Sequence, residues 1–142
     1  MSTTTVRAGT RHGTGRRRDR ALAVAATVAA TLAVWAVAGP LAGVRLAVRA
    51  GGDVRQVGPA SVVITSLVVG LVAWALLEVL ERVSRRARGV WIAIAVVVLV
   101  LSLAGPLGGV TTAATVSLAC LHVAAAAVLI PLLARTGGRV RG

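Results

Sequence analysis

Four long hydrophobic runs, separated by short polar or turn-forming segments, dominate the pattern of this 142-residue chain. They occupy residues 21–40, 59–80, 90–107 and 111–134. An α-helix rises about 1.5 Å per residue, so roughly 20 residues cross the hydrocarbon core of a bilayer, which is about 30 Å thick. Because each run is close to that length, the pattern predicts an all-α membrane protein, a bundle of four transmembrane helices.

The ends of the runs carry helix and turn signals. Pro59 suits the first turn of the second helix, whereas Pro131 should kink or end the fourth. The uncharged link at 105–109 is so short that the third and fourth helices should form an antiparallel pair. Residues 36–38 resemble a signal-peptide cleavage site, but the first run is longer than the roughly 7–15 apolar residues of a signal core, which favours an uncleaved span.

The connection between the first two runs, residues 41–58, alternates apolar with basic or small residues. The alternation covers residues 44–49 and 54–57, and the Ala-Gly-Gly-Asp segment between them is turn sequence. The pattern indicates either a short β-hairpin or a loop without regular structure. A two-stranded hairpin is marginally stable in water, so it would have to lie on the helix ends or on the lipid headgroups.

Composition points to the same class of protein. The chain is 57% hydrophobic and only 14% charged, whereas soluble domains carry about a quarter charged residues. The net charge of +12 comes from arginine, because the sequence has no lysine. Residues 1–20 and 135–142 are basic and have little to bury, so both are predicted to be disordered tails.

The arginines fall mainly on one side of the predicted bundle. Thirteen lie in the two tails and in the turn between the second and third runs, and three lie on the opposite side. Cytoplasmic loops are enriched in basic residues. We therefore expect a multi-pass protein of the bacterial cytoplasmic (inner) membrane with both termini and the central turn in the cytoplasm.

Arginines beside a membrane helix attract anionic lipid headgroups, each by about 1 kcal/mol. A basic tail can also bind nucleic acid, but its position directly before a span favours lipid, and no nucleic-acid partner is expected. The residues expected to contact anionic lipid are Arg16, Arg17, Arg18, Arg20, Arg82, Arg85, Arg86 and Arg88.

The acidic residues near the central turn have arginines one helical turn away. Glu78 precedes Arg82 by four residues, and Glu81 precedes Arg85 by four, so each pair shares a helical face. Glu78 could alternatively carry a proton within the membrane. Its place at the end of the second run favours an ion pair at the membrane edge.

The intramembrane polar residues are few. His122 lies near the middle of the fourth run, at about the depth of Thr31 in the first. An ionisable residue at this depth is a functional candidate, but no carboxylate lies there to relay a proton. We therefore expect a structural hydrogen bond from His122 to Thr31 or Thr27.

Small and polar residues also recur at helical spacing, which is how membrane helices pack closely. On the second and fourth runs, Ser66, Gly70 and Ala119 are the expected packing positions. Trp74 and Trp91 are expected near the inner half of the membrane as interface anchors, and Trp35 toward the outer half. Trp35 and Trp74 lie deep enough to pack between helices instead.

Motifs for catalysis are not found. The sequence has no paired acids, nucleophile elbow or phosphate loop, so no catalytic, cofactor-binding or metal-binding residue is assigned. Cys120 and His122 are two residues apart and point to different sides of a helix, which argues against a metal site. The single cysteine excludes an internal disulfide. A protein that is not an enzyme is expected.

The whole pattern resembles a family of small actinobacterial four-span proteins classed as a domain of unknown function. The residues that carry the likeness include Val34–Val37, Val57-Gly58-Pro59, Ala73–Glu78, Leu101–Pro106, His122 and Ile130-Pro131. The resemblance implies an integral membrane protein and no activity. We expect a non-enzymatic protein that binds lipids, other membrane proteins or a second copy of itself. The alternative is a small oligomeric transporter or channel subunit.

Overall fold

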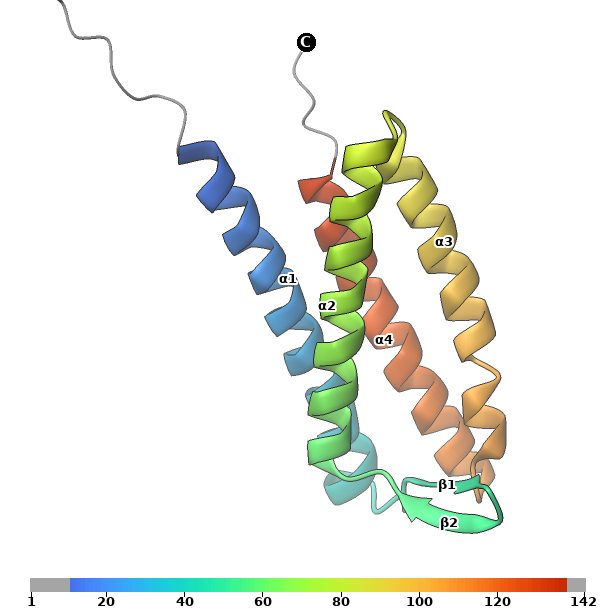
Figure 1. Cartoon of the computed structure of the whole chain (residues 1–142). Helices are drawn as coiled ribbons and strands as arrows, with labels where there is room; N and C mark the ends of the chain where they lie inside the picture. Colours follow the sequence, from blue (N-terminus) through green and yellow to red (C-terminus); the bar gives the residue numbers. More distant parts are fainter. Residues whose placement is uncertain (1–10, 138–142) are drawn as a thin grey trace, which may run out of the picture.

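The structure, a computed structural model, describes residues 11–137 and consists of four long helices and one β-hairpin (Figure 1). In chain order its elements are α1 (Arg11–Ala36), a π-helical turn η1 (Val37–Leu41), β1 (Ala47–Ala50), β2 (Asp53–Gln56), α2 (Pro59–Val83), α3 (Ala87–Ser102), a 3₁₀ turn η2 (Gly105–Gly108) and α4 (Thr112–Thr136).

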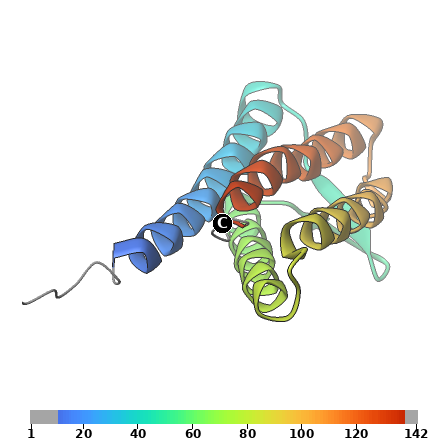
Figure 2. The same ribbon diagram turned by 90° about the horizontal axis from the view of Figure 1, so that it is seen from above.

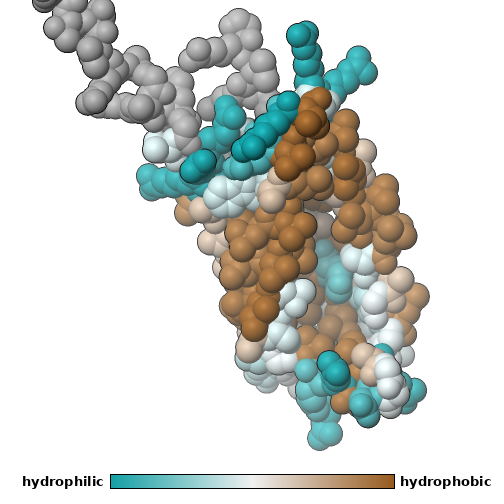
Figure 3. Space-filling view, in the orientation of Figure 1, coloured by the Kyte–Doolittle hydropathy of each residue, from teal (hydrophilic) through white to brown (hydrophobic). Residues whose placement is uncertain are grey.

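Four helical segments within residues 11–137 are long and apolar enough to cross a membrane. They are Thr14–Leu41, Pro59–Val83, Ala87–Gly108 and Thr112–Thr136. The predicted four-helix architecture is therefore confirmed by length and composition. The space-filling view shows a hydrophobic middle with hydrophilic groups gathered at both ends (Figure 3).

The four helices do not pack equally. α1 lies against both α2 and α4, and seen from above α3 stands at the side of the bundle (Figure 2). The buried residues of α3 are Ala87 and Trp91, both in its first five positions. One core cluster, which includes Trp91, Leu77 and Leu133, lies toward the end that holds the start of α1. A second cluster, with Leu46 and Leu118, lies toward the hairpin.

The first helix is longer than its apolar run. It begins at Arg11, so residues 11–20, which were expected to be disordered, are helical. Arginine is a good helix former, and the last residue of the segment, Arg20, is 2% exposed and bonded to other helices. At the other end, Arg135 and Thr136 of the predicted tail are also helical, because α4 continues through them. Residues 1–10 and 138–142 of the predicted tails lie outside the described residues, as do Arg7, Arg139 and Arg141.

Prolines affect two of the helices differently. Pro40 has no amide hydrogen, and around it α1 widens into the π-helical turn, where the amide of Ala42 donates to the carbonyl of Val37 at 2.9 Å. Pro131 does not end α4, which continues to Thr136. Neighbouring helices let membrane helices tolerate an internal proline.

The hairpin, one of the two structures that the alternating pattern allowed, is present. β1 and β2 pair antiparallel, with Ala50 opposite Asp53. The two turn residues, Gly51 and Gly52, have φ values of +61° and +91°, a region that glycine enters without strain. The amide of Val110 donates to the carbonyl of Ala47 at 3.1 Å, so the hairpin rests on the link between α3 and α4.

Candidate functional site

A buried arginine organises one end of the bundle, which we call the charged end: the start of α1, the α2–α3 connection and the end of α4. Arg20 of α1 donates to Oε1 of Glu81 at 2.7 Å and to Oε1 of Glu78 at 3.4 Å. Its Nε donates to Oγ1 of Thr136 at 3.1 Å. One side chain therefore joins α1 to α2 and α4.

The carboxylate of Glu78 has a second partner. The indole N–H of Trp74, one turn earlier on α2, donates to Glu78 Oε1 at 2.6 Å. The side chains of Glu78 and Glu81 are 33% and 21% exposed, so water reaches them in part. We call Arg20, Trp74, Glu78, Glu81 and Thr136 the arginine cluster.

The arginine cluster corrects the expected ion pairs. Within residues 11–137, Glu78 and Glu81 pair with arginines of α1 and not with Arg82 or Arg85. Arg82, Arg85, Arg86 and Arg88 are exposed at the charged end. Packing among three helices already restricts the side chain of Arg20. Each of its hydrogen bonds therefore costs less additional side-chain entropy than the same bond would cost an exposed arginine on α1.

Three other arginines of α1, Arg16, Arg17 and Arg18, are exposed. Arg16 approaches Glu81 at 3.9 Å, and Arg17 and Arg18 face outward at the same end. Contact of these residues with anionic lipid remains a prediction. Arg20 differs from the others because its guanidinium is buried against protein carboxylates.

A second feature is a groove between α2 and α3, floored by α4 and α1. Its volume is about 610 Å³, within the roughly 300–1,000 Å³ typical of small-molecule sites. In Figure 3 a hollow with hydrophilic groups inside separates two hydrophobic ridges. The lining comes from all four helices and is mostly aliphatic.

The polar residues of the first run and His122 all line this groove, but they are not joined as expected. Thr31 Oγ1 lies 2.9 Å from Ser66 Oγ and not against His122. His122 Nδ1 lies 2.8 Å from the carbonyl of Leu118 on its own helix. Thr27 donates to the carbonyl of Ala23. The sequence predicts a similar depth for Thr27, Thr31 and His122 along their helices. Which side chains they contact depends on the rotation of α4 about its own axis.

The expected packing positions have different surroundings. A Cβ placed on Gly70 would lie 2.8 Å from Val24 Cγ1, so glycine allows α1 and α2 to approach closely. Ser66 is 9% exposed and reaches α1 through Thr31. Ala119 is half-buried, beside the buried Leu118. The buried residues of α4 include Ala114, Leu118 and Leu121. The buried face of α4 therefore lies one position before the face of Ala119, which was predicted.

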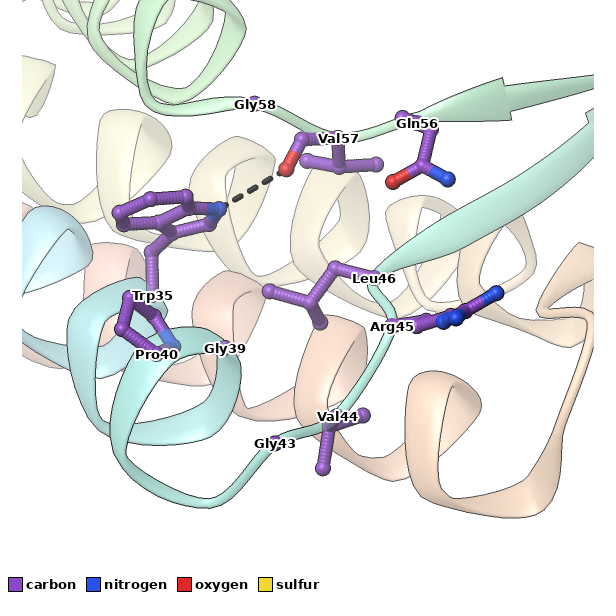
Figure 4. A pocket seen from close by; sticks show the side chains of 10 residues that line it. All are labelled: Trp35, Gly39, Pro40, Gly43, Val44, Arg45, Leu46, Gln56, Val57 and Gly58. Atoms are coloured by element: carbon purple, nitrogen blue, oxygen red, sulfur yellow. Dashed lines mark hydrogen bonds between the residues drawn. The ribbon is translucent and has the colours of Figure 1, made fainter.

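The tryptophans hold helices and the hairpin together. Trp91, expected as an interface anchor, is 1% exposed and donates to the carbonyl of Ala73 at 3.0 Å. Trp35 donates to the carbonyl of Val57 at 2.8 Å beside a hollow of about 330 Å³ under the hairpin (Figure 4). The Trp91 ring is buried and that of Trp35 is half-buried, and both indole N–H groups are satisfied by protein carbonyls.

Metal-binding clusters of three or more His, Cys, Asp or Glu residues do not occur among the described residues. Cys120 is exposed, and His122 is half-buried in the groove. The two notable sites are therefore a charged cluster that joins helices and a groove with apolar walls and a polar floor.

Comparison with known proteins identifies a family and no activity. No curated protein and no solved structure matches the chain. Residues 11–139, which include every helix described above, match a family profile. The chain belongs to the Family of unknown function (DUF6069).

Proposed function

We propose that the protein is an integral protein of the bacterial cytoplasmic membrane that binds lipids and other membrane proteins and catalyses no reaction. Both termini and the α2–α3 connection face the cytoplasm in this proposal. The observation that carries it is the distribution of arginine. Arg45, Arg49 and Arg55 stand at the hairpin end, and the other arginines of residues 11–137 lie on segments at the charged end.

Reporter fusions test this orientation. A reporter after Arg55 should be active only in its extracytoplasmic form, and one after Arg88 only in its cytoplasmic form. The same two fusions in a variant with Arg82, Arg85, Arg86 and Arg88 changed to Gln provide a comparison: the orientation preference should weaken but not reverse, because nine arginines still face three. A cytoplasmic signal from the Arg55 fusion would contradict the proposal.

A small transporter or channel subunit is the second candidate, favoured by the groove. Its coupling residue would have to be Glu78 or His122, since both lie on or near the spans. Glu78 is held by Arg20 and Trp74, an arrangement that favours a structural role over a carrier that opens to water. A flux abolished by Glu78→Gln or His122→Ala, with protein level unchanged, would replace the first proposal by this one.

A further inference from the structure

The groove between α2 and α3 opens toward the outside of the bundle along apolar side chains. Val68, Val69 and Val72 on α2 and Val98 on α3 line it and are also exposed. In a bilayer such a rim faces lipid tails, so a molecule dissolved in the membrane can enter from the side. The inference below rests on the proposed crossing of the bilayer.

Hydrogen-bond donors on the floor of the groove are already used. Thr27 donates to Ala23, and Ser102 donates to Leu99. The hydroxyls of Thr31 and Ser66 bond to each other, and that of Thr31 also lies within hydrogen-bond distance of backbone carbonyls of its own helix. The Trp91 indole is bonded to Ala73.

Ser61, at the exposed end of the lining, donates to the carbonyl of Gly58. Thr65 is the remaining hydroxyl of the lining, and it is exposed. The interior of the groove therefore presents hydrogen-bond acceptors to a ligand.

His122 supplies the strongest of these acceptors. A carbonyl oxygen only accepts, so Nδ1 carries the hydrogen in its 2.8 Å bond to Leu118. In a neutral imidazole the other nitrogen, Nε2, is then an acceptor. Among residues 11–137 no hydrogen-bond partner occupies Nε2.

The lining contains no acidic residue. A cationic donor would have no counter-charge there, and an uncompensated charge inside a membrane is costly. A neutral hydroxyl is a donor without that cost. We propose that the groove binds a neutral, lipid-soluble alcohol whose hydroxyl group donates a hydrogen bond to Nε2 of His122.

Three probes of one chain length test this assignment on the full-length protein in detergent: 1-hexadecanol, methyl hexadecyl ether and hexadecane. Binding raises the thermal unfolding midpoint in proportion to ligand occupancy. The alcohol should act at a concentration about five- to tenfold lower than the ether, the ratio expected for one hydrogen bond. Equal action of the alcohol and the ether on the unaltered protein would overturn the proposal.

Two variants on α4 locate the effect. His122→Phe keeps a ring but removes the acceptor, so the preference for alcohol over ether should disappear. Cys120→Ala, an exposed position outside the groove, should keep it. A preference that persists in His122→Phe would overturn the assignment. If His122→Phe does not fold, the comparison of alcohol and ether on the unaltered protein decides alone.

A photoreactive 1-hexadecanol identifies the place of binding. Its label should fall on groove residues such as Val72 and Val98 and be displaced by unlabelled alcohol but not by hexadecane. Labelling spread evenly around the bundle would contradict a specific binding site. A dimer in which a second copy of the chain fills the groove would also contradict it. The fusion experiments above do not depend on this result, so failure of one leaves the other interpretable.

Discussion

The helices are joined tightly at the charged end and packed loosely along the groove. At the charged end, Arg20 ties α1 to α2 and α4 by hydrogen bonds to three residues, and it is 2% exposed. Along the groove, α3 has no buried residue after Trp91 and stands apart from α2 (Figure 1).

The difference follows from the solvent. Lipid tails are as apolar as valine, so burying a valine between helices gains little, and close packing depends on small residues and polar bonds. α1 and α2 have both, in Gly70 and in the bond between Thr31 and Ser66. Beyond Trp91, α3 offers mainly branched aliphatic side chains, and the gap that they leave is the groove.

The largest expected loss of stability comes from removing the buried arginine, which joins the helices at the charged end. Arg20→Met removes the buried cation that Glu78 and Glu81 share and leaves only the exposed Arg16 near Glu81, so we expect about 3 kcal/mol less unfolding free energy. That is the low end for a broken buried ion pair, because both carboxylates retain partial access to water. Reversible unfolding of the purified protein in mixed detergent micelles measures the loss.

Arg18→Met is the matched control, since Arg18 is exposed on the same helix. It should change the unfolding free energy by less than about 0.5 kcal/mol. Adding Glu78→Gln and Glu81→Gln to Arg20→Met should restore part of the stability. Equal stability of the Arg18 and Arg20 variants would show that the arginine cluster does not hold the helices.

Adding a side-chain atom at the close contact between α1 and α2 should have an intermediate effect on stability. In Gly70→Ala the new Cβ meets Val24 Cγ1 at 2.8 Å, so one helix must shift, at a cost of about 1–2 kcal/mol. The same unfolding assay measures it. Gly89→Ala on α3, where a Cβ meets nothing within 4 Å, should be neutral or slightly stabilising.

A second substitution checks the cause of the Gly70 effect. Val24→Ala removes the methyl groups that the new Cβ would meet, so the double variant should recover most of the loss. Additive losses in the double variant would place the strain elsewhere.

The smallest expected effect belongs to the hydroxyl pair on the groove floor. Thr31→Val removes the 2.9 Å bond to Ser66, and bonds of this kind in membrane proteins contribute about 0.6 kcal/mol. A double-mutant cycle with Ser66→Ala isolates the coupling. A coupling energy indistinguishable from zero would mean that the two hydroxyls do not bond in the membrane.

Spans and hairpin could be predicted because each depends on local sequence. Run length decides how many helices can cross, and the Gly51-Gly52 turn between alternating segments allows a hairpin. The helical start of α1 was missed because its residues 14–19 are exposed and bury almost nothing locally, whereas the buried Arg20 has its partners on distant helices.

Part of the arginine cluster was nevertheless readable. Thr27 and Thr31, the expected partners of His122, share one face of α1, and that face extended back by two turns from Thr27 reaches Arg20. On α2, the face of Ser66 and Gly70 extended forward by three turns reaches Glu81. The rotation of α4 could not be predicted, because in a helix rich in alanine many faces are equally small, and His122 therefore bonds its own helix.

The wide separation of the arginine cluster along the chain has a consequence for biogenesis. Arg20 precedes Glu78 by 58 residues and Thr136 by 116. At typical rates of translation the first interval lasts about 3 to 12 s. During that time Glu78 and Glu81 have not yet been made, so Arg20 cannot form the pairs that join α1 to α2. The bond to Thr136 comes last, so the three helices become tied together only when α4 has been synthesised.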